Sequence, residues 1–531
     1  MRAGLPVAVF VLALSVYVAG MAPGLLWGDS AEMQILAAIG GVAHPTGYPL
    51  FTLVGRLFTA FGGGDLAWRA NLLSATFAAG TLALLMAFLL SRGVRPLAAA
   101  AGVAVWGLSF TFWATAQRAE VYSLATFVAV GALWCTLLAL ERGARGMRLA
   151  AGFLLGLTLA GHMAFAPWVA VAGLVLAWRV PRVGVAWLGD EVLLLLAFVA
   201  GLSPYVYLVW ADQTGHGLNY LKLVELVNWP VTPVAPEFLD ARARFVWLIT
   251  GRNELPPVPI QPTLRSLGKN TSDAVFLFAV FELGPLALAA AWFSLRRHWR
   301  DARAHMPLLL AMFVASVLFS LVTSGYKILS VFLIPSYLLC AVFVALGVQE
   351  WLARHPGRRV AAVVALLLVA NTLLAHSARL VSHEHPFGPF RSQVFEEDDR
   401  VEHALIPSMA HEDEARRFVE SAVQALPDSA LVICEWREFM ALLYVQRVEH
   451  RRTDLALHPS GYPRLLQSVE RWQHTYDLRQ HPVVVVSPLA SMAPHLVQAD
   501  TLTLATGQRV VVTHTALSIG DAATLPPTRL H

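Results

Sequence analysis

The chain has 531 residues, of which 57% are hydrophobic and only 14% are charged, and its mean hydropathy is +0.58. This composition lies outside the range of soluble globular proteins and predicts a mainly helical, polytopic membrane protein. The formal net charge of +4 comes mostly from Arg in short loops between apolar runs, a pattern that reports membrane topology and argues against a nucleic-acid partner.

The first apolar run, residues 6–26, contains no charged side chain and is long enough, at 1.5 Å per residue, to cross a hydrocarbon core of roughly 30 Å. It is longer than the apolar core of a signal peptide, so we expect a membrane anchor. Further apolar runs occupy residues 71–90, 97–116, 121–140, 149–178, 188–210, 273–293, 306–323, 329–349 and 360–376.

The run 149–178 is long enough for one very tilted helix or for two short helices that turn near Gly161 and His162. The positive-inside rule favours two helices, because they place all the flanking Arg residues on one side. These residues are Arg142, Arg145, Arg148, Arg179 and Arg182. The count then becomes about eleven spans, with the N-terminus cytoplasmic and everything after residue 376 outside.

The sequence therefore predicts a membrane domain over residues 1–376 and an extracytoplasmic soluble α/β domain over 377–531. In this second part, residues 413–426 and 438–449 have helical spacing, whereas 431–434 and 483–486 read as buried strands. The Pro-rich patch in the long loop 211–272 predicts extended backbone. With three cysteines spread along the chain, disulfides are not expected to hold the fold.

The stretch W-G-D-S-A-E directly follows the first apolar run and places Asp29 and Glu32 just beyond the bilayer. Their spacing puts the two carboxylates on one face of a helix. The same spacing is that of a capping box, in which both acids only start a helix. From the spacing alone, capping is the favoured interpretation and catalysis the alternative.

The next motif, H-P-T-G-Y-P, contains His44 and Tyr48 and forms a rigid turn, because two prolines fix the backbone around a glycine. It is either a plain re-entry corner or one aromatic wall of a substrate cleft. Farther along, Arg118, Glu120, His162 and Lys327 map to outer turns, where they would ordinarily be solvated or interfacial residues. Glu282 lies within an apolar run and must face protein or a cavity.

Five motifs in order resemble a bacterial membrane family of the GT-C glycosyltransferases, related to protein O-mannosyltransferase-like proteins. They are W-G-D-S-A-E, H-P-T-G-Y-P-L, R-A-N-L-L-S-A, A-E-V-Y-S-L and G-L-T-L-A-G-H, at residues 27–32, 44–50, 69–75, 119–124 and 156–162. The resemblance covers roughly residues 5–210, and the chain departs from the family pattern at Ala31 and Thr46.

The resemblance implies a GT-C fold, a bacterial inner-membrane location and a polyprenyl-phosphate-linked sugar as donor. It assigns Asp29 to the catalytic centre, as base for the acceptor hydroxyl of a protein, glycan or lipid in an inverting transfer. Glu32 or Glu120 would orient the acceptor or hold a divalent cation, Mg²⁺ or Mn²⁺, and the sequence does not decide between these roles. The further expected substrate-binding residues, mostly cations for the lipid phosphate, are His44, Tyr48, Arg56, Arg69, Arg118, Tyr122, His162 and Lys327.

Two other functions compete with this one. A transporter or lipid flippase also needs many helices and a few intramembrane polar groups, but it predicts two similar halves with paired broken helices, a pairing that we do not find. A third interpretation makes the tail a binding or assembly module and the membrane part its anchor. Eleven spans are more than an anchor requires, so this interpretation ranks last.

Overall fold

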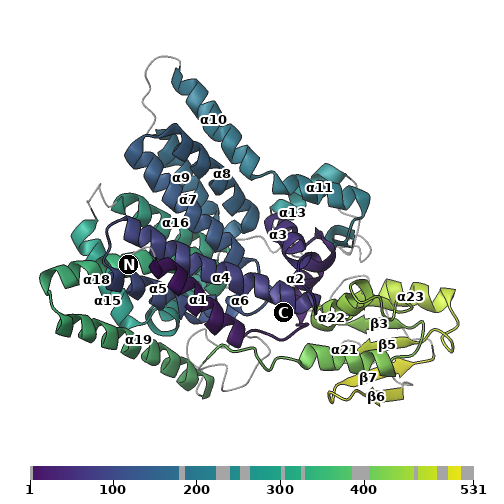
Figure 1. Ribbon diagram of the computed structural model, residues 1–531. Coiled ribbons are helices and arrows are strands. Elements are labelled where there is room, and N and C mark those ends of the chain that lie inside the picture. Colours follow the sequence, from purple (N-terminus) through teal and green to yellow (C-terminus); the bar gives the residue numbers. More distant parts are fainter. Residues whose placement is uncertain are drawn as a thin grey trace. The chain divides into compact units, whose positions relative to one another are not determined.

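The computed structural model describes residues 4–178, 186–222, 240–250, 264–299, 305–323, 329–384, 406–459, 465–486 and 500–515 (Figure 1). The chain divides into two compact units, each built from segments that are distant in sequence. Unit 1 comprises Met1–Met21, Leu72–Tyr205 and Pro259–Ala410, and unit 2 comprises Ala22–Asn71, Val206–Val258 and His411–His531. The expected boundary at residue 376 remains a prediction.

Unit 1 is helical throughout the residues that the structure describes. Its core is a large apolar cluster in which Leu, Ala, Val and Phe from many helices interlock. Its elements are α1 (Gly4–Ala19), most of α4 (Leu66–Ser91), α5 (Pro96–Gly107), α6 (Phe110–Ala116), α7 (Tyr122–Arg142), α8 (Arg145–Gly161), η1 (Met163–Phe165), α9 (Ala166–Trp178), α10 (Ala186–Gly201), α14 (Leu264–Phe276), η3 (Leu277–Glu282), α15 (Pro285–His298), α16 (Met306–Thr323), α17 (Leu329–Phe332), α18 (Ile334–Arg354) and α19 (Arg358–Glu384).

By length and composition, five helices in the described part of the chain can cross a membrane, or up to eight if each bent helix pair is counted as one span. The protein is therefore a multi-pass membrane protein, and the expected number of about eleven spans stays a prediction. Three apolar runs that the sequence presents as single spans are bent. The bend is 72° between α5 and α6, 43° between α10 and α11 (Pro204–Thr214), and 109° between α14–η3 and α15.

Other expected spans fit with adjusted ends. The run 149–178 breaks at Gly161 and His162, as the charge pattern favours. Helix α1 ends at Ala19, so it is shorter than the run 6–26 from which it was expected. Helix α19 continues to Glu384, beyond the expected end at residue 376.

Helices α8 and α10 approach each other through glycine. A Cβ atom added to Gly201 would lie 2.1 Å from the carbonyl oxygen of Phe153, and one added to Gly156 would lie 2.2 Å from the carbonyl oxygen of Phe198. Small residues at membrane helix interfaces allow the backbones to approach this closely. The resulting van der Waals packing drives helix association in lipid, where the hydrophobic driving force is absent.

Glu282, at the end of the π-helical turn η3, faces protein as its position requires. Its carboxylate accepts hydrogen bonds from the Thr111 backbone N–H (3.0 Å) and from the Thr111 hydroxyl (2.5 Å), at the start of α6. The buried Arg379 guanidinium donates to the Phe281 carbonyl at 2.5 Å and lies 4.6 Å from the centre of the Phe110 ring. Glu282 thus helps to fix the start of α6 and lies next to a buried cation.

Unit 2 contains the first expected outer loop. Helix α2 (Gly28–Ile39) leads through β1 (Gly41–Val42) into α3 (Pro49–Thr59). Strand β1 pairs in parallel with β2 (Leu218–Asn219), in the long loop 211–272. That loop also contains α13 (Ala241–Ile249), whereas its Pro-rich patch lies outside the described residues.

The C-terminal part of unit 2 contains a five-stranded mixed sheet of order β4-β3-β5-β7-β6 (Figure 1). The strands are β3 (Leu431–Cys434), β4 (Ala456–Pro459), β5 (Val483–Val486), β6 (Asp500–Thr503) and β7 (Arg509–Thr513). The accompanying helices are α21 (Glu414–Ala425), α22 (Trp436–Arg447) and α23 (Leu465–Thr475). Strand β3 pairs in parallel with β4 and β5, which makes two successive βαβ units and accounts for its wholly apolar sequence.

Candidate active site

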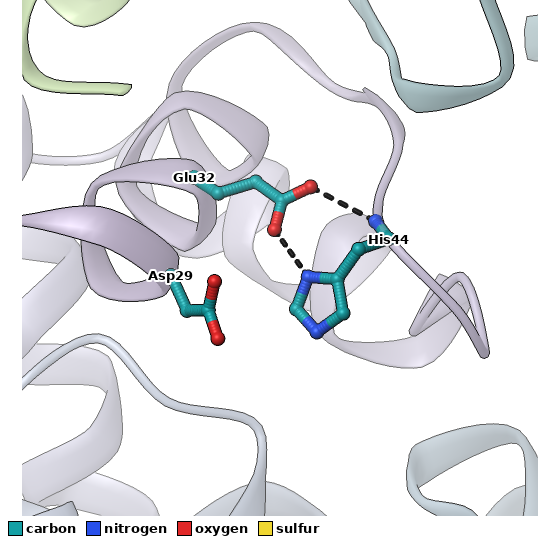
Figure 2. A group of neighbouring side chains, drawn as sticks. All are labelled: Asp29, Glu32 and His44. Carbon is teal, nitrogen blue, oxygen red and sulfur yellow. Dashed lines mark hydrogen bonds and ion pairs between the residues drawn. The ribbon is translucent and has the colours of Figure 1, made fainter. Parts of the chain in front are cut away.

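Helix α2 presents two carboxylates with opposite surroundings. Asp29 lies in its first turn and is exposed, whereas the Glu32 side chain is completely buried (Figure 2). The N-cap residue is Trp27, so the capping box favoured from the spacing does not form. Glu32 turns instead toward the corner motif that follows the helix.

Both carboxylate oxygens of Glu32 are used by one residue, His44. Oε1 accepts a hydrogen bond from the His44 backbone N–H at 2.9 Å, and Oε2 is in close contact with Nδ1 of the ring (Figure 2). A carboxylate oxygen accepts hydrogen bonds, so an ionised Glu32 pairs with the tautomer of His44 that carries its proton on Nδ1. Glu32 therefore fixes both the backbone and the ring of His44 beside Asp29.

The corner itself is held by local bonds. Tyr48 has a left-handed backbone with φ of 40° and precedes α3, whose first residue is Pro49. Its hydroxyl donates to the Pro45 carbonyl at 3.1 Å. Gly47, with φ of 87°, has no room for a side chain, because a Cβ atom would lie 2.6 Å from Leu208. The Tyr48 ring lies 5.1 Å from that of His44. The expected rigidity of the turn stays a prediction.

Asp29 has a partner far away in the sequence. Its Oδ1 accepts a hydrogen bond of 2.8 Å from the indole Nε1 of Trp436, the first residue of α22. The Trp436 ring lies 5.9 Å from that of Tyr220, which in turn lies 6.3 Å from the His44 ring. Aromatic rings thus line the region of the two carboxylates. Neither Trp436 nor Tyr220 lies in a motif that marks it as a site residue in the sequence.

Two of the Arg residues that were expected to bind the lipid phosphate donate hydrogen bonds to backbone carbonyls. The Arg56 guanidinium donates to the Ala38 carbonyl near the end of α2. The Arg69 guanidinium donates to the carbonyls of Thr59, Phe61, Gly62 and Gly64 at 2.6–3.3 Å and so ties the turn before α4. Both residues have a structural task, and a role in substrate binding stays a prediction.

Four of the other candidates belong to unit 1 and form two pairs. Arg118 and Glu120 lie 3.4 Å apart, both partly exposed, after α6. The backbone N–H of Glu120 donates to the Ser74 hydroxyl at 3.1 Å. The rings of Tyr122 and buried His162 have centroids 4.8 Å apart. Lys327 lies outside the described residues.

One side-chain group in the described part of the chain has the composition of a metal site. Asp29, Glu32 and His44 each offer a ligand atom, and these atoms lie within 4.8 Å of one another. Two carboxylates with an imidazole suit a cation that accepts mixed oxygen and nitrogen donors, whereas Mg²⁺ takes oxygen ligands and water. Because His44 already occupies both Glu32 oxygens, a cation here would compete with His44 for that carboxylate.

The fold is similar to that of ArnT, a protein of known structure. Crystal structures of ArnT from Cupriavidus metallidurans, in the apo state and bound to undecaprenyl phosphate, superpose with TM-scores of 0.54 and 0.53. They cover 98% and 97% of this chain and 99% of each ArnT chain, at 15% and 14% sequence identity. At such identity the likeness concerns the fold alone.

The sequence comparison gives a second likeness, to protein O-mannosyl-transferases. Residues 29–184 match the family model of the Protein O-mannosyl-transferase TMEM260 N-terminal domain. The mouse Protein O-mannosyl-transferase TMEM260 is 34% identical over 234 residues, which is 39% of this chain and 32% of the mouse protein. The match thus spans about a third of that curated relative. The resemblance to O-mannosyltransferase-like GT-C proteins inferred from the motifs is confirmed.

Proposed function

We propose that the protein is an inverting glycosyltransferase that moves a sugar from a polyprenyl-phosphate donor to an acceptor hydroxyl at the outer face of a membrane. The observation that carries the proposal is the exposed Asp29 carboxylate, which Trp436 holds beside buried Glu32 and partly exposed His44, in the segment that matches an O-mannosyl-transferase domain. The fold likeness to ArnT, a protein crystallised with undecaprenyl phosphate, supports the class of donor.

In this reaction the acceptor oxygen attacks the anomeric carbon from the side opposite the phosphate. A bond forms between that oxygen and that carbon, while the bond from the carbon to the phosphate oxygen breaks and leaves its electron pair on the lipid phosphate. The hydroxyl proton passes to Asp29, which acts as general base and then releases it to solvent. Glu32 and His44 maintain the shape of the corner that faces the reacting groups.

The lipid phosphate is already a good leaving group, so neutralising its charge matters more than protonating it. Arg118, His162 and Lys327 are the cations that we propose for this task, with Tyr122 beside His162. A divalent cation bound by Asp29 and His44 is an alternative source of positive charge, and we propose that the enzyme tolerates its absence. The test is turnover after EDTA treatment, followed by addition of Mn²⁺ or Mg²⁺.

The proposed location is a bacterial inner membrane crossed about eleven times, with a cytoplasmic N-terminus and the residues after 376 outside. The positive-inside distribution of Arg supports this orientation. The acceptor would be a protein, glycan or lipid on that outer side, and the isoprenoid tail of the donor would stay among the membrane lipids.

The experiment is sugar transfer by the full chain in lipid vesicles, with undecaprenyl-phosphate mannose as donor and extracted envelope material as acceptor. Wild-type protein should move label from lipid to acceptor, and Asp29→Asn should lower turnover by about 100-fold or more, the order expected for loss of a general base. The matched control is Asp428→Asn, because the Asp428 side chain is 96% exposed.

Equal turnover of Asp29→Asn and wild-type protein, at equal expression, would refute the base assignment. Movement of the lipid-linked sugar across sealed vesicles without any new glycosidic bond would instead favour the transporter or flippase hypothesis. A panel of donors that differ only in the sugar then defines the sugar specificity.

A further inference from the structure

The indole of Trp436 lies at a position in the α/β fold where functional side chains are commonly found. It begins α22, directly after the buried parallel strand β3 and the N-cap residue Glu435. In sheets of parallel strands, the segment beyond the carboxyl end of a strand is where functional side chains gather. Its Nε1–H donates to Oδ1 of Asp29 at 2.8 Å.

Neighbouring contacts hold the start of α22 against the start of α2. The Arg437 guanidinium lies 4.3 Å from the centre of the Trp27 ring, and that ring lies 5.3 Å from the ring of Phe418 on α21. Arg437 is itself held by Glu414 at 3.2 Å. Two successive residues of α22 therefore contact the two neighbours of Gly28: Trp436 contacts Asp29, and Arg437 contacts Trp27.

Asp29 needs such a partner because its side chain is exposed. An exposed carboxylate samples several rotamers, and only some direct an oxygen at an acceptor. A flat indole that is packed against Tyr220 and Phe439 has little freedom of its own, so its N–H defines one place for Oδ1. A hydrogen bond to a charged acceptor is also stronger than a neutral one.

We propose that Trp436 is a positioning residue for Asp29, so that the C-terminal α/β fold sets the geometry of the transfer reaction. This inference rests on the proposed function. Trp436 holds Oδ1, which leaves Oδ2 to receive the proton of the acceptor hydroxyl. Its contribution is one of orientation, where a misplacement of about 1 Å costs on the order of 100-fold in rate.

The first test compares Trp436→Phe with the wild-type chain in the vesicle assay. We expect kcat to fall by about 10- to 100-fold while KM for undecaprenyl-phosphate mannose changes by less than about threefold, because the donor itself does not need the indole N–H. The matched control is Trp472→Phe on α23. This variant removes an indole N–H that donates to the His481 carbonyl at 3.0 Å. It should leave both constants unchanged.

A second replacement separates the N–H from the shape of the ring. Benzothienylalanine incorporated at position 436 has the outline of tryptophan but carries sulfur in place of N–H. If it lowers kcat as much as Trp436→Phe does, the hydrogen bond is responsible. Wild-type kcat with this analogue would overturn the inference.

A third measurement does not depend on turnover. In protein labelled with 15N-tryptophan, the Trp436 indole resonance is identified by its disappearance in Trp436→Phe, and Asp29→Asn should shift it upfield because a charged acceptor is lost. An unmoved resonance would show that the contact is absent. If wild-type protein transfers no sugar although this shift occurs, the proposed function fails and the contact stands.

Discussion

Glu32 and His44 are bound to each other twice, once through the backbone of the histidine and once through its ring. The glutamate is completely buried and belongs to α2, whereas the histidine opens the rigid corner that leads to α3. One side chain thus joins the helix that carries Asp29 to the turn that faces it.

Replacing this carboxylate by an amide should disturb the corner. Glu32→Gln puts an NH₂ group where a negative oxygen now meets Nδ1–H or the backbone N–H of His44, so a donor faces a donor. We expect a loss of about 2 kcal/mol in stability, the usual value of a hydrogen bond to a charged group, and a drop in transfer rate. Thermal unfolding in detergent measures the first effect. Glu470→Gln, at an exposed position on α23, should change neither.

Glu282 and Arg379 are both buried in unit 1 and interact electrostatically, which predicts a pattern across variants. Glu282→Ala removes one charge and leaves the other buried, which should cost about 3–5 kcal/mol. The double variant Glu282→Leu with Arg379→Met replaces both charges by apolar groups and should recover much of that loss. The measurement is the apparent melting temperature of purified protein. A double variant less stable than Glu282→Ala would contradict this account.

Close packing of α8 and α10 makes a prediction about glycine. Gly201→Val would push side-chain atoms into the Phe153 carbonyl, which a Cβ would already approach to 2.1 Å. We expect overpacking to cost about 3 kcal/mol and to reduce the yield of folded protein. Gly173→Val on α9 is the control, since no atom lies within 4 Å of a Cβ added there. Similar yields for both variants would show that the two helices can separate freely.

The C-terminal fold should respond to pH through Asp454. Arg452 and the Ser429 amide lower the pKa of Asp454 from 3.8 to about 2. Because the pKa is lower in the folded state, the ionised carboxylate stabilises the fold at neutral pH. That contribution begins to fall below about pH 4 and disappears as the pH drops through 2. The side chain is one third exposed, so we discount the effect to about 1 kcal/mol.

The corresponding measurement is the difference in melting temperature between wild-type protein and Asp454→Asn. The wild-type chain should be the more stable of the two at pH 7 and should have lost most of that advantage at pH 2.5. A difference that does not change with pH would mean that the aspartate stabilises the fold without its charge.

Continuous apolar runs were the most informative part of the sequence. The run 306–323 coincides with α16 (Met306–Thr323), and the expected strands 431–434 and 483–486 coincide with β3 and β5. Strands β3 and β5 are buried at every position, so each of their residues is apolar. The two helices beside β3 were found to within two residues at each end.

Bends and tertiary partners were harder to predict. The run 273–293 is apolar on both sides of its 109° bend, so hydropathy does not reveal the break, although Gly284 with φ of 81° followed by Pro285 marks it. The D-S-A-E spacing favoured a capping box because a local partner is always available. In the structure, the Glu32 carboxylate instead accepts a hydrogen bond from His44, which lies twelve positions later in the chain.

The candidate site was predicted only in the part that comes from contiguous residues. Asp29, Glu32 and His44 lie within one short segment and were selected together. Trp436 was missed because it is 407 positions from Asp29, and a single sequence contains no information that pairs them. Its place directly after a buried strand was the one local signal.

The division of the chain into two units determines where it can be truncated. Residues 22–71 share a compact body with residues 411–531, so trimming the polypeptide at residue 410 would not yield an intact membrane half. Such a fragment would keep the long apolar helices of the described residues yet remove Phe418 and Arg437 from the Trp27 ring, leaving a bare aromatic surface at the entry to α2.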